Sequence, residues 1–321
     1  MRLLVASPIH ADALDVLRSE HDVRLAIGAP EAELAAAAGD REAIIFRSGV
    51  TIGPAALGAP DLRLLVRAGS GLDNLDLDLV RRRGIELHRI PGPGAQAVAE
   101  LTFGLMIGLA RGIVHADRQL RAGHWIKSDL VGYNLRGKRL GIVGLGSIGT
   151  RVAQLGIAWG MRPIGCVENP TDERGAAFAA KGIELADFAT VLAEGDFVTI
   201  HVPLGGPTRN LIGAAELARM KTGAYLVNIA RGGVVDETAL LEALAPPGRL
   251  RGAALDVHMA EGEGRISPLA DLPNVILTPH IGAQTIDAQE EIGREIVAII
   301  RRFSGQGDQP EMIIETDRSP A

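Results

Sequence analysis

The feature that most constrains this chain is the run LGIVGLGSIG at residues 140–149, where an apolar strand leads into a glycine-rich turn. Gly144, Gly146 and Gly149 have the spacing of a dinucleotide-binding turn. The first allows the tight turn, the second lets the backbone approach a pyrophosphate, and the third lets the following helix pack on the strand. The phosphates would meet the free N–H groups at the N-terminus of that helix. A purely structural glycine turn is the alternative, but a strand before and a helical pattern after favour a nucleotide site.

Strand and helix patterns alternate on both sides of this turn. The first hundred residues contain four apolar runs typical of buried strands, RLLVAS, AIIFRSG, LRLLVRAGSG and GIELHRI. The strand that opens the turn and five later runs make six more, the later ones being RPIGCV, DFVTIHV, AYLVNIA, RGAALDV and NVILTP. A long helical pattern runs from about Gln96 to near Gly123, and another follows Gln284. Strands that alternate with helices predict parallel sheets covered on both faces, here in two α/β domains.

Composition narrows the class of protein. The chain has 321 residues, of which 47% are hydrophobic, enough for a sizeable core. The net charge is −6 and basic residues are scattered, which argues against nucleic acid or an anionic membrane as the main partner. The basic run RRRG, which ends at Gly84, predicts a helix C-terminus. The single cysteine, Cys166, excludes an intrachain disulfide and is expected to be buried. No apolar run is long enough to span a membrane, so we expect a soluble, cytoplasmic protein.

Polar residues at the ends of the predicted strands are candidates for a ligand site. Ligands of open α/β sheets bind beyond the carboxyl ends of the strands. That rule selects His201, Asn228, Arg231, Asp256, His258, Glu261 and His280. A nicotinamide enzyme that reduces a keto acid needs a cation for the substrate carboxylate and an acid for the developing alkoxide. Arg231 suits the first role, with a surface ion pair as the alternative.

Three histidines compete for the role of the acid, and periodicity does not choose among His201, His258 and His280. A neighbouring carboxylate would keep one of them protonated near neutral pH. These histidines do not have the spacing of metal ligands, so no metal site is predicted. An acid about 20 residues beyond the glycine turn should bind the ribose hydroxyls of NAD. That acid is expected at position 167, which is a valine, and Glu168 is the next residue. No arginine follows directly to bind a 2′-phosphate, and a carboxylate would repel one, so NAD is favoured over NADP.

From about Ala43 to Gln289 the chain resembles the D-isomer-specific 2-hydroxyacid dehydrogenases, especially their phosphoglycerate dehydrogenase branch. The motifs that carry the resemblance are VRAGSGLDNLD, VAELTFGLMIGLAR, LRGKRLGIVGLGSIG, NIARGGVVDETAL, GAALDV and NVILTPHIGAQT. The resemblance implies a discontinuous arrangement. Residues 1–97 and 285–321 would form a flavodoxin-like substrate-binding domain, and a Rossmann NAD-binding domain, residues 98–284, would be inserted into it.

The resemblance also implies the catalytic residues. An arginine after N-x-A, a glutamate five residues beyond the aspartate of LDV, and the histidine of PH correspond to Arg231, Glu261 and His280. His280 would be the acid/base, Glu261 would orient it and support its protonated form, and Arg231 would hold the substrate. Glu261 speaks against the related formate dehydrogenases, which carry an amide there.

Further contacts are implied for cofactor and substrate. Besides the glycine turn and Glu168, the cofactor contacts would be Ser147, Ile148, Val202, Ala230, Asp256, Gly282 and Ala283. The backbone amides of Ser70 and Gly71 would bind the substrate carboxylate. Arg47 and Arg67 match arginines that phosphoglycerate dehydrogenases direct at the substrate phosphate, although either could be a surface ion-pair residue instead.

The sequence departs from the family pattern at several positions. Val167 replaces the usual ribose-binding aspartate, and Gly94 stands where an asparagine is common near the substrate. His258 stands where an aromatic residue is usual, and Gly262 replaces a proline after the glutamate. The sequence shows no regulatory domain of the kind found in longer phosphoglycerate dehydrogenases, so feedback by serine is not expected.

The resemblance implies an NAD-dependent D-2-hydroxyacid dehydrogenase, with D-3-phosphoglycerate as the expected substrate and serine biosynthesis as the expected pathway. A hydroxypyruvate or glyoxylate reductase is the alternative within the enzyme class. An NADH-binding corepressor-like protein is the alternative from another class. The apolar helix pattern LTFGLMIGLARGIVHADRQL matches a segment that packs against a second subunit, so a homodimer is expected; an interdomain core helix would give the same pattern.

Overall fold

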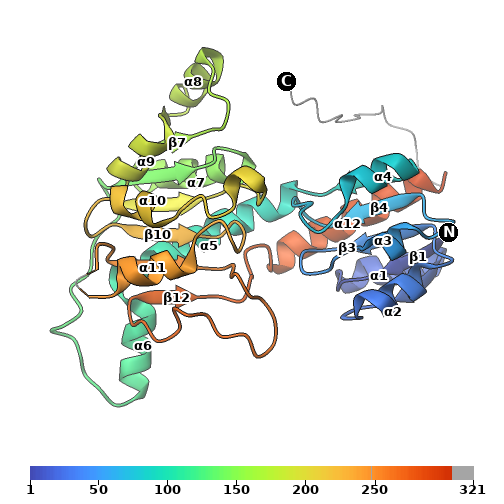
Figure 1. The fold of residues 1–321 in the computed structure, drawn as a ribbon, viewed down its shortest axis with the longest axis horizontal. Helices are drawn as coiled ribbons and strands as arrows, with labels where there is room; N and C mark the ends of the chain where they lie inside the picture. Colours follow the sequence, from blue (N-terminus) through green and yellow to red (C-terminus); the bar gives the residue numbers. More distant parts are fainter. Residues whose placement is uncertain (247, 306–321) are drawn as a thin grey trace. The chain divides into compact units, whose positions relative to one another are not determined.

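The computed structural model describes residues 1–246 and 248–305. The chain divides into two compact units (Figure 1). Unit 1 comprises Met1–Pro91 and the segment that begins at Ile286, and unit 2 comprises Gly92–Thr285. The division falls at the start of a helix, slightly before the boundary expected between residues 97 and 98. Residues 306–321 of the expected substrate-binding domain lie outside the described residues.

Unit 1 contains a parallel sheet with the strand order β2-β1-β3-β4-β5. Its strands are β1 (Arg2–Val5), β2 (Asp22–Leu25), β3 (Ala43–Phe46), β4 (Leu64–Arg67) and β5 (Glu86–Arg89). Its helices are α1 (Ala11–Glu20), α2 (Glu31–Ala38), α3 (Pro54–Leu57), α4 (Leu77–Arg83) and α12 (Ile286–Phe303). The order 2-1-3-4-5 is that of the flavodoxin-like doubly wound sheet, as expected.

Alternating side chains of these strands enter two cores. Leu3 and Val5 pack in the cluster that contains α1 and α12, whereas Leu4 packs in the cluster that contains α2, α3 and α4. The last helix, α12, drawn in red, thus covers the same face as the blue helix α1 (Figure 1). Its Ile292 and Ile296 are almost completely buried in this unit.

Unit 2 contains a parallel sheet with the order β12-β11-β10-β9-β6-β7-β8 over its described residues. The strands are β6 (Arg139–Val143), β7 (Arg162–Cys166), β8 (Glu184–Leu185), β9 (Phe197–Ile200), β10 (Tyr225–Asn228), β11 (Gly252–Leu255) and β12 (Val275–Leu277). The helices are α5 (Gly92–Arg111), α6 (Ile113–Arg121), α7 (Ser147–Ala158), α8 (Asp172–Ala179), α9 (Phe188–Glu194), α10 (Ala214–Arg219) and α11 (Glu237–Leu244), with the 3₁₀ turn η1 (Gly206–Thr208). Counted from β6, the order is the Rossmann order 3-2-1-4-5-6 with one strand added at the edge.

Both faces of this second sheet are covered. Helices α5, α7 and α8 pack with Leu140 and Ile142 on one face, and α9, α10 and α11 pack with Val143 and Ile200 on the other. The strand order reverses between β6 and β9, which are neighbours. In sheets of this type the ligand site lies beyond the carboxyl ends of the strands at that point, which is where the glycine turn follows β6.

Three features differ from the sequence expectations. Strands β2 and β8 were not predicted, because both are edge strands with mostly exposed side chains and therefore lack an apolar run. The helix predicted to reach Gly123 is wrong in its continuity: α5 ends at Arg111 and α6 begins after Gly112, which has a φ of 60°. By contrast, α4 ends in the basic run at Gly84, with a φ of 63°, and Cys166 is buried, as predicted.

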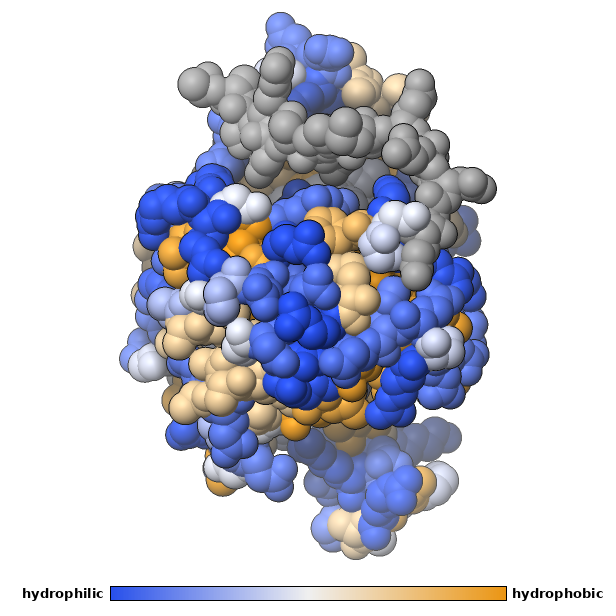
Figure 2. Space-filling view, turned by 90° about the vertical axis from the view of Figure 1, so that its right-hand side faces the viewer, coloured by the Kyte–Doolittle hydropathy of each residue, from blue (hydrophilic) through white to orange (hydrophobic). Residues whose placement is uncertain are grey.

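Within the described residues, no single helix is long and apolar enough to cross a membrane. Helices α5 and α6 meet the length and composition only when taken together, and they are bent by 62° at their junction. The face of the molecule in Figure 2 is largely hydrophilic, with smaller hydrophobic areas between the polar side chains.

Candidate active site

The three glycines of the turn after β6 have different surroundings. A Cβ on Gly144, whose φ is 98°, would lie 2.7 Å from the carbonyl oxygen of His201, and a Cβ on Gly149 would lie 2.0 Å from the carbonyl oxygen of Gly144. A Cβ on Gly146 would meet nothing within 4 Å. Two glycines therefore allow close packing, and the third leaves open space at the N-terminus of α7. That open approach to a helix N-terminus fits a dinucleotide pyrophosphate.

The expected ribose-binding acid lies beside this turn. The carbonyl of Cys166, the last residue of β7, accepts hydrogen bonds from the backbone N–H groups of Gly144 and Leu145, both at 3.2 Å. Val167 is half-buried against the core, and Glu168 is exposed directly after it. The carboxylate thus stands at the carboxyl end of the strand next to the glycine turn, where it could reach a ribose.

Glu261 and His280 form a hydrogen-bonded pair. The Nδ1 atom of His280 lies 2.9 Å from Oε2 of Glu261. An ionised carboxylate only accepts, so Nδ1 carries the proton, and Nε2 remains for exchange with a ligand. His280 has a φ of 53°, a conformation that costs about 1–3 kcal/mol outside glycine and is kept only where neighbouring contacts impose it.

The surroundings of Glu261 lower the pKa of its carboxyl. Burial by itself would raise the pKa of its carboxyl. The hydrogen bond from His280, the charge of that ring and the backbone N–H of His258 outweigh burial, so the pKa of Glu261 lies below its usual value of 4.5. Glu261 is therefore ionised at neutral pH and accepts the hydrogen bond of the His280 ring.

Asp256 shapes the turn that carries His280. Its side chain is 1% exposed, and its Oδ1 accepts from the hydroxyl of Thr278 at 2.6 Å and from the backbone N–H of Ile281 at 2.9 Å. Its Oδ2 accepts from the backbone N–H of Gly282 at 2.8 Å. The backbone N–H of His280 donates to the Asp256 carbonyl at 2.8 Å. The carboxylate expected to contact the cofactor is thus also the anchor of this turn.

Arg231 lies in a turn after β10 that Asn228 holds. The Asn228 side chain accepts from the backbone N–H of Ala230 and donates to the carbonyl of Arg231, both at 3.1 Å. Nη1 of Arg231 donates to the Ala230 carbonyl at 2.7 Å. A Cβ on Gly232 would lie 1.8 Å from the carbonyl oxygen of His258, so only glycine lets this turn approach the segment that leads to Glu261.

The structure distinguishes the three competing histidines. Both ring nitrogens of His201 are buried and have no hydrogen-bond partner within the described part of the chain, and burial lowers the pKa of His201 to about 3. His201 is therefore neutral and unsuited to donate a proton. His258 contacts the carbonyl of Thr278 through Nε2, at 2.9 Å. His280 is the one of the three that contacts Glu261 through its ring.

The expected substrate residues lie in unit 1. Arg67 is 3% exposed, and its guanidinium donates from Nε to the Gly71 carbonyl at 2.8 Å and from Nη1 to the Ala68 carbonyl at 3.0 Å. It therefore shapes the loop that contains Ser70 and Gly71. Arg47 follows β3 and is half-buried, and burial lowers the pKa of its guanidinium.

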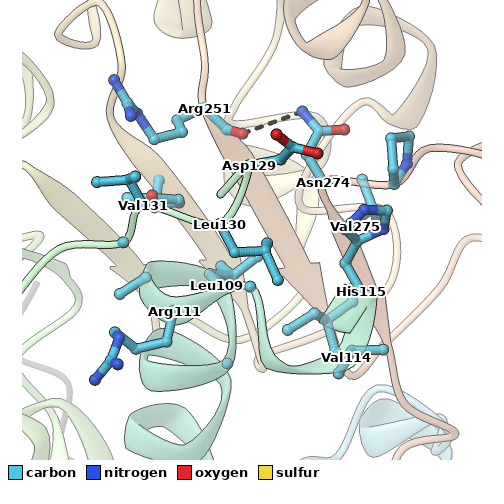
Figure 3. A pocket seen from close by; sticks show the side chains of 17 residues that line it. Leu109, Arg111, Val114, His115, Asp129, Leu130, Val131, Arg251, Asn274 and Val275 are labelled. Atoms are coloured by element: carbon cyan, nitrogen blue, oxygen red, sulfur yellow. Dashed lines mark hydrogen bonds between the residues drawn. The ribbon is translucent and has the colours of Figure 1, made fainter. Parts of the chain in front are cut away.

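Two cavities of unit 2 lie at opposite ends of its strands, one at the carboxyl ends and one at the amino ends. One of about 550 Å³ is lined by His258, Glu261 and His280. The other, of about 350 Å³, is lined by residues at the α5–α6 junction and at the starts of β10 and β12, with Arg111, His115 and Asn274 among them (Figure 3). The second cavity is lined by none of the three expected catalytic residues, whereas Glu261 and His280 line the first. Among residues 1–246 and 248–305, no cluster of three or more His, Cys, Asp or Glu side chains is arranged to hold a metal ion.

Sequence reasoning missed part of this network. Asn228 was named only as a polar strand-end residue, His258 as a competitor for the role of the acid and a departure from the family pattern, and Thr278 was not named. Their roles depend on hydrogen bonds between turns that are distant in the chain, and no spacing in the sequence reports such bonds. The proximity of each residue to a strand end was the one signal available.

Comparisons with known proteins agree with this architecture. Residues 103–282 match the model of the "D-isomer specific 2-hydroxyacid dehydrogenase, NAD binding domain". D-3-phosphoglycerate dehydrogenase of Methanocaldococcus jannaschii is 38% identical over 100% of this chain, and the chain spans only 60% of the length of that protein. Hydroxypyruvate reductase of Thermotoga maritima is 37% identical over 95% of this chain and 98% of its own length.

A solved structure of D-lactate dehydrogenase from Aquifex aeolicus, complexed with NAD and lactic acid, superimposes with a TM-score of 0.82 at 27% identity. The alignment covers 95% of this chain and 96% of that one. The fold expected from the sequence is confirmed, and unit 2 is an NAD-binding domain. The chain belongs to the family of D-isomer-specific 2-hydroxyacid dehydrogenases, NAD-dependent oxidoreductases that act on 2-hydroxy acids.

Proposed function

We propose that this chain is an NAD-dependent dehydrogenase that interconverts D-3-phosphoglycerate and its 2-keto acid. The observation that carries the proposal is the hydrogen-bonded pair of His280 and Glu261 at the carboxyl edge of the NAD-binding sheet. A histidine with its Nδ1–H committed to an ionised carboxylate has Nε2 available to take or give one proton. This is the function that oxidation of a 2-hydroxyl group requires besides a hydride acceptor.

Each residue of the trio has one task in this proposal. Arg231 binds the substrate carboxylate, because a guanidinium pairs with a carboxylate through two parallel hydrogen bonds. In the oxidation direction Nε2 of His280 accepts the proton of the C2 hydroxyl, and in the reduction direction it returns that proton to the keto oxygen. Glu261, which is ionised, holds the ring by its Nδ1–H. When bound, NAD supplies the hydride acceptor and NADH the donor.

The residues around the glycine turn are suited to hold that cofactor. The N-terminus of α7, with Gly146, Ser147 and Ile148, would bind the pyrophosphate. Glu168 would accept from the ribose hydroxyls, and its charge would repel a 2′-phosphate, so NAD is preferred to NADP. The residues that would border the nicotinamide half are Val202, Ala230, Asp256, Gly282 and Ala283.

In this proposal, residues of unit 1 determine which substrate is bound. The loop with Ser70 and Gly71 would offer backbone amides to the substrate, and Arg47 would bind the phosphate together with Arg67. The name of the Methanocaldococcus relative supports this choice. In that role the chain would act in serine biosynthesis.

One observation favours a second candidate, a reductase of small unphosphorylated acids such as hydroxypyruvate or glyoxylate. The guanidinium of Arg67 is almost completely buried and donates to two carbonyls of its own loop. That arrangement suits a structural role better than a phosphate ligand. The Thermotoga relative carries the name of such a reductase.

The deciding experiment is NADH oxidation with phosphohydroxypyruvate, hydroxypyruvate and glyoxylate under identical conditions. A kcat/KM for the phosphorylated acid at least ~100-fold above the others would support the first candidate, because a bound phosphate contributes a few kcal/mol through charge-assisted hydrogen bonds. A preference for the small acids would support the second. Tight NADH binding without turnover of any 2-keto acid would contradict both and support an NADH-binding, corepressor-like protein.

We further propose a cytoplasmic homodimer. None of the side chains of α6 is buried, and Ile113 and Leu120 on this helix are 50% and 60% exposed. Trp125 and Val131, in the segment that follows, are 79% and 83% exposed. Hydrophobic residues gathered in this way are typical of a surface that another chain covers. A single buried cysteine, Cys166, suits a reducing compartment.

A further inference from the structure

We propose that His258 is a positioning residue of the acid/base pair, in that its imidazole fixes the turn that carries His280 while its backbone N–H fixes Glu261. The inference rests on the proposed function and adds a residue to it. The hydrogen bonds of His258 go to Glu261 and to the Thr278 carbonyl, so it would act on His280 through these two residues.

The side-chain contact joins two turns. Nε2 of His258, which follows β11, lies 2.9 Å from the carbonyl oxygen of Thr278, which follows β12. A carbonyl oxygen only accepts, so Nε2 carries the proton and donates. The Thr278 hydroxyl is committed to Asp256 at 2.6 Å, so both polar groups of this residue are fixed. A ring without a donor at this position would leave the carbonyl with the backbone N–H of His280, at 3.0 Å, and remove its link to the turn after β11.

The backbone contact joins the same turns through Glu261. The N–H of His258 donates to Oε1 of Glu261 at 3.2 Å, and Oε2 of the same carboxylate faces Nδ1 of His280 at 2.9 Å. His280 is two residues beyond Thr278. The path from His258 to Thr278, along the chain to His280, across to Glu261 and back to His258 is therefore closed. A closed set of contacts of this kind can hold His280 at its unfavourable φ of 53°.

The backbone of His258 and Met259 also contacts other elements of unit 2. The carbonyl of His258 packs against Gly232, where a Cβ would lie only 1.8 Å from that oxygen. The backbone N–H of Met259 donates to Oε1 of Glu237 at 2.7 Å, and Glu237 is buried at the start of α11. The backbone at residue 258 is thus fixed independently of its side chain. A substitution of the imidazole therefore tests the contact with Thr278 and leaves the backbone contact with Glu261 in place.

Two substitutions separate the donor from the ring. His258→Phe keeps the volume and removes the N–H, whereas His258→Gln places an amide N–H at about the position of Nε2. In steady-state assays with the best keto acid, we expect His258→Phe to lower kcat by ~10- to 100-fold, since a small misplacement of a catalytic group can cost about this much. We expect the loss to appear in kcat, with the KM of the keto acid and the Kd of NADH within ~3-fold, because the substitution removes a contact inside the turn that carries His280.

His258→Gln should restore kcat to within ~3-fold of the original protein, because a neutral donor to the Thr278 carbonyl is regained. A kcat for His258→Phe equal to that of the unchanged protein would overturn the proposal. So would a His258→Gln variant as impaired as His258→Phe, because the donor would then be irrelevant. If His258→Phe does not fold, the comparison of His258→Gln with the unchanged protein carries the kinetic test.

A spectroscopic readout makes the test independent of turnover. In ¹⁵N spectra of the cofactor-free protein at pH 8, we expect Nε2 of His258 to carry the proton and Nδ1 to lack it. The Nδ1–H proton of His280 should be visible in the unchanged protein and in His258→Gln, and broadened by solvent exchange in His258→Phe. The opposite tautomer of His258, or an unchanged His280 signal in His258→Phe, would overturn the proposal. Failure of the unchanged protein to reduce any keto acid would contradict the proposed function, while these signals would still judge the role of His258.

Discussion

Glu261 and His280 come from two turns that are 19 residues apart in the chain, yet their side chains meet at 2.9 Å. The Glu261 side chain is 38% exposed, and its pKa is lowered by the hydrogen bonds to its two oxygens and by the neighbouring histidine rings, against the effect of burial. The negative charge of Glu261 thus depends on His258 and His280, which contact its two oxygens. Single substitutions can test that dependence in two ways.

The first residue-scale prediction concerns catalysis. His280→Gln and Glu261→Gln should each lower kcat by ~10²- to 10⁴-fold, the usual contribution of general acid–base catalysis. The Kd of NADH should stay within ~3-fold, since these side chains handle the substrate proton. His115→Gln is the matched control and should retain activity, because His115 lines the cavity at the amino ends of the strands. Stopped-flow reduction and NADH fluorescence titration measure both quantities, and an active His280→Gln enzyme would contradict the assignment.

The second residue-scale prediction concerns pH. Because the pKa of Glu261 is lowered in the folded state, its ionised form contributes stability above its unfolded value of 4.5. That contribution is lost as the pH falls from 4.5 through the lower folded pKa. The stability difference between the unchanged protein and Glu261→Gln should therefore be largest near pH 7 and shrink below pH 4.5. Urea unfolding at several pH values measures it, and a difference independent of pH would show that the carboxylate is not held in its charged form.

At the scale of elements, the β6–turn–α7 unit has two glycines that look alike in the sequence and differ in the structure. A Cβ on Gly149 would collide with the Gly144 carbonyl at 2.0 Å, whereas a Cβ on Gly146 would meet nothing. Gly149→Ala should therefore destabilise the protein by several kcal/mol, as overpacking against backbone does. Gly146→Ala, with an ordinary φ of −81°, should change stability by less than ~1 kcal/mol.

The same pair separates folding from cofactor binding. Gly146→Ala should weaken NADH binding at least ~10-fold, because its methyl group would occupy the space through which the pyrophosphate approaches the helix. Thermal unfolding and calorimetric titration of both variants provide the comparison. Unimpaired NADH binding by Gly146→Ala would remove this turn from the cofactor site.

Most elements could be predicted from the sequence because buried parallel strands are continuous apolar runs. Strands β2 and β8 could not, since an edge strand with exposed side chains such as DVRL has no such run. The break at Gly112 was hidden because α5 contains other glycines that remain helical, such as Gly104 and Gly108. The trio of the site followed from motif resemblance. The contacts of His258, Thr278 and Asn228 did not, because they depend on how separate turns face each other.

At the scale of the whole molecule, the exposed hydrophobic residues of α6 and the segment after it lead to a prediction on assembly. The double variant Ile113→Glu/Leu120→Glu should shift the protein from dimer to monomer, because two buried charges would remain unpaired in the interface. Ile27→Glu, at a residue of unit 1 that is 47% exposed, is the matched control. Sedimentation velocity measures the mass, and a dimer that survives the double variant would place the interface elsewhere.

The position of α12 has a consequence for how the chain is made. The ribosome produces β1, α1 and the rest of the first sheet before any residue of unit 2, yet Ile292, Ile296 and Ile300 of α12 belong to the core with Leu3 and Leu17. Until α12 leaves the exit tunnel, α1 alone covers that face of the sheet, and the apolar side chains that α12 will bury contact water. Unit 2 is complete earlier, at Thr285. The domain that is synthesised first is therefore the one that finishes folding last, and during synthesis the part of this face that awaits α12 is the surface that chaperones have reason to bind.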